Sequence, residues 1–177
     1  MSVSNLKPRE EKATVKSDLI SQGCIDLLNY RINEEEKSWR MYEDMYLWLE
    51  DKGYVNAAAL WRTYAQEELT HADWGKQYLL GLGIKPKLLA MPALSGNYSL
   101  PSIIKDSHAH EVLITKQCQV LAMKATAEGD FMLHELALQY LKEQHEELGR
   151  QQNWLDQLES FGSDRLALRL LDNAMAV

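Results

Sequence analysis

The sequence predicts an all-α fold, a four-helix bundle with a long crossover between its second and third helices and a short fifth helix at the C-terminus. Apolar residues recur at alternating spacings of four and three along four segments, as in helices that pack at a shallow angle in a bundle. Only 9 Gly and 4 Pro occur, and several of them separate these segments. The length of 177 residues and the hydrophobic fraction of 46% suit one domain with a sizeable core.

Gly and Pro divide the chain into four long segments with helical periodicity. These predicted helices are Asp18–Asp51, Val55–Leu82, Ser102–Ala127 and Asp130–Phe161. Lys52-Gly53-Tyr54 separates the first two helices, and Glu128-Gly129 separates the last two. Because such short connections allow only a tight reversal, we expect two antiparallel pairs of helices.

Residues 83–101 connect the two pairs and contain Pro86, Pro92 and Gly96, so they are predicted to be non-helical. The connection is long enough to run the length of a bundle, as a crossover does. After the fourth helix, Ser163 or Asp164 is a suitable N-cap for a short terminal helix that ends near Met175.

Residues 1–17 mix basic and acidic side chains without an apolar run, so we expect a flexible N-terminal arm rather than a secretory signal, followed by one domain over residues 18–177. No window of about 20 apolar residues could span a membrane. The net charge of −7 argues against a nucleic-acid partner. Cys24 and Cys118 have no paired spacing, which suggests reduced core thiols and a cytoplasmic protein.

Each long helix carries one carboxylate on its apolar seam: Glu35, Glu68, Glu111 and Glu147. Glu35 precedes Gly53 by 18 residues and Glu68 follows it by 15, so at about 1.5 Å per residue their heights differ by about 4 to 5 Å. Glu111 and Glu147 each lie 18 residues from Gly129. Buried carboxylates are costly without a counter-charge. Since no Lys or Arg occurs on the seams, we expect a multivalent cation to neutralise them.

His71 follows Glu68 by three residues, so both side chains lie on one helix face and can bind the same ion. Several carboxylates with one imidazole suit iron or manganese better than zinc. A bridging Glu68 would allow two ions. Diiron bundles often carry a second Glu-x-x-His on another helix, but this chain has Gln144 and Glu147 at those positions. His110, His134 and His145 are expected at the surface.

Four segments of the chain closely resemble those of the non-haem bacterial ferritins: Leu28–Glu35, Ala65–His71, His110–Thr115 and Glu143–Glu147. The resemblance extends from about Leu19 to the C-terminus, with the segments in the same order and with matching helix lengths. It implies iron ligands as follows: Glu35, Glu68 and His71 for a first iron, Glu68, Glu111 and Glu147 for a second, and Glu67, Glu143, Glu146 and Glu147 for a third. It also implies that Gln144 lies beside the second iron and Tyr42 beside the diiron centre.

The resemblance implies an iron-storage function with a shell of 24 subunits around a mineral cavity. Fe(II) would be oxidised at the diiron ferroxidase centre by O2 or H2O2 and stored as an Fe(III) oxyhydroxide, and no haem is expected. Gln139 replaces a tryptophan of some relatives, which leaves an electron-donor role at that position without support.

Several alternatives remain open from the sequence. A haem-containing bacterioferritin would have a Met directly after Glu68, where this chain has Leu69. A rubrerythrin-type peroxidase would need a cysteine-rich iron domain, and no CxxC occurs. A haem-free relative of bacterioferritin, another diiron oxidase or peroxidase, or a non-enzymatic metal-binding bundle would use similar acids. Tyr42 could serve core packing alone, and the third-site acids could be ordinary solvated charges.

Overall fold

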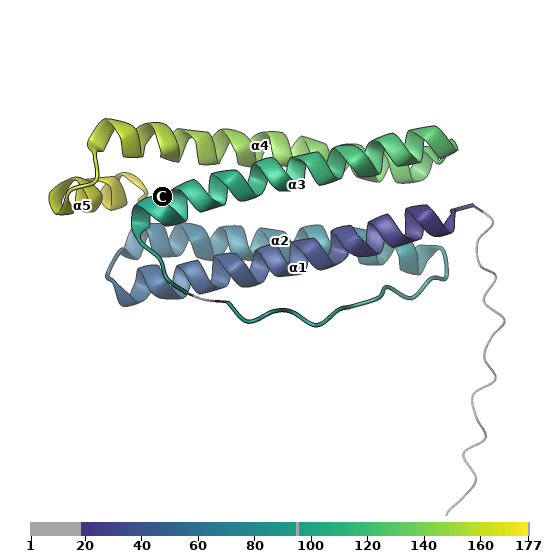
Figure 1. The fold of residues 1–177 in the computed structure, drawn as a ribbon, viewed down its shortest axis with the longest axis horizontal. Coiled ribbons are helices and arrows are strands. Elements are labelled where there is room, and N and C mark those ends of the chain that lie inside the picture. Colours follow the sequence, from purple (N-terminus) through teal and green to yellow (C-terminus); the bar gives the residue numbers. More distant parts are fainter. Residues whose placement is uncertain (1–18, 95, 177) are drawn as a thin grey trace, which may run out of the picture.

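The computed structural model describes residues 19–94 and 96–176, and this part of the chain contains five helices and no strand. The helices are α1 (Gln22–Asp51), α2 (Val55–Gly81), α3 (Leu100–Glu128), α4 (Phe131–Phe161) and α5 (Arg165–Ala174). Figure 1 shows two antiparallel pairs, α1 with α2 and α3 with α4, that pack into one bundle, with α5 at one end. The predicted all-α fold is therefore confirmed. The predicted N-terminal arm, residues 1–17, lies outside the described residues.

The helix ends differ from the prediction by a few residues because of local capping. Ser21 caps α1 by accepting a hydrogen bond from the backbone N–H of Cys24 (3.1 Å), so the helix begins at Gln22 rather than at Asp18. Ser99 and Ser102 form a reciprocal capping box, and α3 therefore begins at Leu100, two residues earlier than predicted. Pro101 is tolerated there because the first turn of a helix does not need its N–H.

The connection between α2 and α3 runs along the outside of the bundle, beside α1 (Figure 1). Asn29 and Asn33 of α1 hold it through side-chain amides. The N–H of Lys87 donates to Asn29 Oδ1 and the N–H of Leu89 donates to Asn33 Oδ1, both at 2.7 Å. These bonds satisfy backbone groups of a segment whose described residues form no helix or strand. The expected long crossover is present and is fixed to α1.

The apolar core is divided into two clusters, one toward each end of the bundle. One contains Leu28, Leu79, Cys118 and Leu133, and the other contains Leu49, Trp61, Ile104, Leu158 and Leu171. Between the two clusters, each long helix contributes buried polar residues. The fold therefore places a polar layer across the middle of a hydrophobic bundle.

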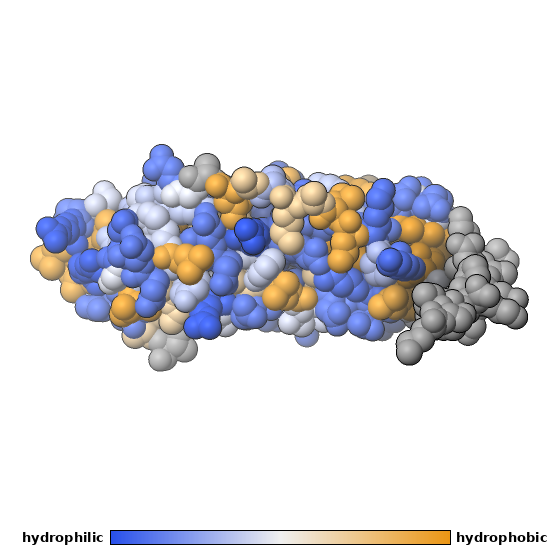
Figure 2. All heavy atoms as spheres, turned by 90° about the horizontal axis from the view of Figure 1, so that it is seen from below, coloured by the Kyte–Doolittle hydropathy of each residue, from blue (hydrophilic) through white to orange (hydrophobic). Residues whose placement is uncertain are grey.

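Figure 2 shows the face of the bundle seen from below Figure 1, where hydrophilic residues predominate and apolar residues occur in scattered groups. The connection beside α1 contributes exposed apolar side chains, among them Leu88 and Leu89. Among the described helices, none combines the length and the apolar composition that crossing a membrane requires.

Candidate metal centre

Four carboxylates from four different helices meet in the middle of the bundle. Glu35 of α1, Glu68 of α2, Glu111 of α3 and Glu147 of α4 are only 1% to 5% exposed. We call these four residues the carboxylate layer. The helical seams bring them to one height, as the residue counts from the two turns predicted.

Together with His71 and Glu143, the carboxylate layer forms three groups of ligand atoms, and within each group the atoms lie within 4.8 Å of one another. The first cluster is Glu35, Glu68 and His71, the second cluster is Glu68, Glu111 and Glu147, and the third cluster is His71, Glu143 and Glu147. Glu68 belongs to both the first and the second cluster. A carboxylate has two oxygens, so Glu68 is placed to bridge two cations.

Burial and mutual repulsion change the acidity of these carboxylates. Burial raises the pKa of Glu68 well above its usual range, and the nearby Glu35, Glu111 and Glu147 raise it further. Burial, followed by repulsion from Glu111 and Glu35, raises the pKa of Glu147 to about 9. With a pKa near 9, Glu147 retains a proton at neutral pH when no cation is bound, and a divalent cation would displace that proton on binding.

Neutral hydrogen-bond donors surround Glu111 in the second cluster. The hydroxyl of Tyr42 donates to Glu111 Oε1, and Gln144 Nε2 donates to Glu111 Oε2 at 3.2 Å and also to Glu147 Oε2. Thr115 donates to Gln144 Oε1 at 3.0 Å, which fixes the orientation of the amide. Burial raises the pKa of Glu111 to about 7, although these bonds from Tyr42 and Gln144 lower it.

His71 joins the first cluster to the third. Its Nδ1 lies 3.6 Å from Glu68 Oε2 and 3.7 Å from Glu147 Oε1. Burial lowers the pKa of His71, which favours the neutral imidazole that binds metals. The Trp74 ring lies 4.8 Å from the imidazole, and Tyr140 donates a hydrogen bond of 2.7 Å to the backbone carbonyl of His71. The Trp74 ring packs against the imidazole, and the Tyr140 bond holds the backbone that carries it.

Arg31 lies inside the bundle beside the first cluster, which sequence reasoning missed. Its Nε lies 2.8 Å from Glu35 Oε1, both side chains are buried, and its Nη1 donates to Gln117 Oε1. No Lys or Arg occurs on the seams, but Arg31 pairs with Glu35 from beside its seam, and Arg150 approaches Glu147 in the same way. Arg31 is one turn before Glu35 and off the seam, but a long side chain reaches across that distance. The spacing of four residues was the signal that could have found it.

Only some of the acids expected at a third iron lie together in one cluster of the described residues. Glu143 joins His71 and Glu147 in the third cluster, but Glu67 and Glu146 belong to none of the clusters found in the described residues. Glu146 is exposed. Glu67 instead pairs with Arg150, whose Nη2 lies 3.0 Å from Glu67 Oε2.

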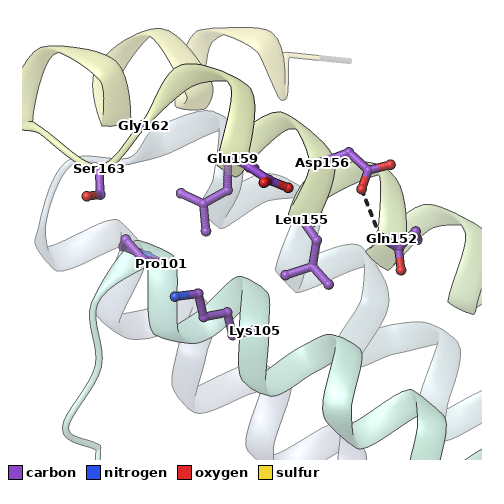
Figure 3. A pocket seen from close by; sticks show the side chains of 9 residues that line it. Pro101, Lys105, Gln152, Leu155, Asp156, Glu159, Gly162 and Ser163 are labelled. Carbon is purple, nitrogen blue, oxygen red and sulfur yellow. Dashed lines mark hydrogen bonds between the residues drawn. The ribbon is translucent and has the colours of Figure 1, made fainter.

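A pocket of about 510 Å3 lies away from the carboxylate layer, near the start of α3 and the end of α4 (Figure 3). Pro101, Lys105, Leu155, Glu159 and Ser163 are among its lining residues. None of the residues of the three clusters lines it. The candidate metal site is therefore the layer inside the bundle, where the groups of ligand atoms lie.

Comparison with known proteins agrees with this geometry. Residues 25–161 match the family model of the ferritin-like domain. The chain is 31% identical to a probable bacterial non-haem ferritin-like protein of Haemophilus influenzae, an alignment that covers 87% of this chain and 94% of the relative. It is 30% identical to the bacterial non-haem ferritin of Escherichia coli O157:H7 over 89% of this chain and 96% of that one.

Solved structures show the same similarity. An open-pore ferritin from the archaeon Archaeoglobus fulgidus superimposes with a TM-score of 0.85 at 28% sequence identity, covering 89% of this chain and 98% of that one. A humanized archaeal ferritin gives a TM-score of 0.85 at 27% identity. Sequence and structure thus point to the same family over nearly the whole described chain.

Proposed function

Because the chain belongs to the ferritin family, we propose that it stores iron by oxidising Fe(II) in the carboxylate layer and holding the Fe(III) product as an oxyhydroxide mineral. The observation that carries the proposal is the sharing of Glu68 between the first and second clusters. One shared carboxylate between two ligand groups provides neighbouring places for two Fe(II) ions. Two-metal sites hold their ions about 3.5 to 4 Å apart.

The proposed reaction is a two-electron transfer. Each of two Fe(II) ions gives up one electron, and O2 takes up both electrons and two protons to become H2O2. With H2O2 as the oxidant, two further Fe(II) ions and two protons yield two water molecules. Oxygen-rich ligands with one imidazole accept iron in both oxidation states, and the Fe(III) product must then leave for storage.

The residues of the layer have distinct roles in this proposal. Glu35 and His71 hold the first iron, Glu111 and Glu147 hold the second, and Glu68 bridges them. Tyr42 and Gln144 do not need to bind iron, because they orient Glu111 through hydrogen bonds. Protons held by the buried carboxylates before binding would be released as Fe(II) enters.

We further propose that 24 copies form a hollow shell that encloses the mineral, and that the protein works in the cytoplasm. The two buried free thiols, Cys24 and Cys118, are compatible with a reducing compartment. A shell of 24 chains of 20.3 kDa would have a mass of about 490 kDa. Native mass spectrometry measures this directly, and a monomer or dimer would contradict the storage role while leaving the metal site possible.

The enzymatic part of the proposal is tested by mixing the apo-protein anaerobically with Fe(II), admitting O2 and following the absorbance of Fe(III). We expect the wild type to show a fast phase that saturates near two irons per subunit. Glu68→Ala and His71→Ala should each abolish this phase. Glu50→Ala is a matched control, because Glu50 is an exposed acid outside the clusters. A non-enzymatic bundle would bind Fe(II) but show no fast phase in any variant.

A further inference from the structure

Arg150 of α4 places a guanidinium at the edge of the carboxylate layer. Its two terminal nitrogens contact both oxygens of Glu67, with Nη2 at 3.0 Å from Oε2 and Nη1 at 3.3 Å from Oε1. The same Nη2 lies 3.8 Å from Glu147 Oε1. The guanidinium also stacks on Tyr64, with its central carbon 5.1 Å from the ring centroid. Arg150 therefore has a defined position between an α2 acid and an acid of the layer.

This position borders the third cluster. Glu147 Oε1, which Arg150 approaches, is also 3.7 Å from His71 Nδ1. A cation held by His71, Glu143 and Glu147 would therefore lie close to a guanidinium that remains charged at all physiological pH values. Like charges at this separation repel, most strongly where water is partly excluded.

Arg150 also pairs with Glu67, so this carboxylate is not available as a metal ligand. A two-pronged pair with a guanidinium uses both carboxylate oxygens, which is the strongest geometry for such a pair. Glu67 has no other ligand atom to offer, and it belongs to none of the three clusters found in the described part of the chain. Arg150 therefore disfavours a third ion in two ways. It supplies positive charge, and it occupies the carboxylate of Glu67.

We propose that Arg150 is a built-in counter-cation that restricts the centre to two metal ions per subunit. It lies between Glu67 and Glu147, two of the four acids that the resemblance to bacterial ferritins implies for a third iron. This inference rests on the proposed diiron function, since it concerns how many ions the same layer accepts. Arg150 determines the metal stoichiometry through Glu67 and the local charge, and it does not itself bind metal.

Equilibrium binding of Co(II) to the assembled apo-protein tests the inference without any oxidation step. We expect the wild type to saturate at two Co(II) per subunit and Arg150→Gln to saturate at three. The double variant Arg150→Gln with Glu67→Gln returns to two, because the released acid is then lost. Arg62→Gln is the matched control, since Arg62 stacks on Tyr46 and contacts none of the cluster acids, and it stays at two.

Arg150→Met is a second variant that keeps an unbranched apolar stem beside Tyr64, in case Arg150→Gln does not fold or assemble, and it is also expected to bind three ions. Three Co(II) in the wild type, or two in a folded Arg150 variant, would overturn the inference and leave the diiron proposal standing. Fewer than two in the wild type would instead contradict the proposed function itself. Native mass and circular dichroism confirm that each variant is folded and assembled.

Discussion

The first and second clusters share Glu68 but have different neighbours. The first cluster borders a fixed positive charge, because Arg31 pairs with Glu35. The second cluster borders neutral donors at Glu111, because Tyr42 and Gln144 bond to it, and its neighbouring positive charge is the more exposed Arg150, 3.8 Å from Glu147. A cation that enters the first cluster must compete with Arg31 for Glu35. A cation that enters the second cluster displaces protons, and the hydrogen bonds that Tyr42 and Gln144 donate to Glu111 can remain. The two halves are therefore expected to differ in affinity, with the second cluster filling first.

Removing Glu68 would have the largest effect, because it is the residue that both clusters use. We expect Glu68→Ala to lower the rate of Fe(II) oxidation by more than about 100-fold, beyond the loss typical of residues that only support ligands. Stopped-flow absorbance of Fe(III) measures this rate, with Glu50→Ala as control. A variant that kept one fast-oxidised iron would show that the halves function without sharing Glu68.

Breaking the Arg31 pair would test the first cluster alone. We expect Arg31→Gln to lower the free energy of unfolding of the apo-protein by about 3 kcal/mol, because Glu35 loses its buried counter-charge. Zn(II) would reduce this loss, since the ion replaces the missing charge. Unfolding midpoints at one fixed subunit concentration provide the measurement. Arg40→Gln, at an exposed position of the same helix, should change neither midpoint.

Removing the phenol of Tyr42 would test the second cluster. We expect Tyr42→Phe to weaken binding of one of two Co(II) ions by about tenfold, since Glu111 loses a donor that orients it. Calorimetric titration distinguishes the two binding events. Tyr78→Phe, at a tyrosine whose hydroxyl contacts Asp130 instead, is the control. An equal loss at both events would show that Tyr42 acts on the whole layer.

The free energy of unfolding of the apo-protein should depend on pH through Glu147 of the second cluster, and this effect is expected to be smaller than those above. The pKa of Glu147 is raised from 4.5 to about 9 in the folded state. The folded chain therefore holds a proton that the unfolded chain has released, and stability falls as pH rises toward 9. Between pH 7 and 9 the expected loss is about 1.4 kcal/mol per pH unit. Urea unfolding at several pH values measures it, and Glu147→Gln should remove this contribution to the slope while leaving that of Glu68.

Sequence periodicity was sufficient to predict the helices and the carboxylate layer. Both depend on regular geometry, since a rise of 1.5 Å per residue fixes height and a seam fixes direction. Helix ends were less predictable because they depend on individual caps, such as Ser21 for α1 and Ser99 for α3. The metal-ligand roles of the layer remain predictions.

Side chains beside the seams were harder to predict, because their direction depends on packing rather than on spacing. Arg31 and Arg150 reach acids from off-seam positions, and the sequence shows only that such acids lie within reach. His110 was expected at the surface, and this was wrong. It is half-buried, lies 2.7 Å from the Ser38 hydroxyl, and packs edge-on against the Tyr42 ring. Burial lowers its pKa to about 4.

The central claim is that the carboxylate layer binds two iron ions bridged by Glu68. Crystals of the protein soaked anaerobically with Fe(II) would test it through anomalous scattering at the iron absorption edge. We expect two peaks per subunit about 3.5 to 4 Å apart, one in the first cluster and one in the second, with Glu68 in contact with both. A single peak, or iron bound only outside the carboxylate layer, would contradict the account.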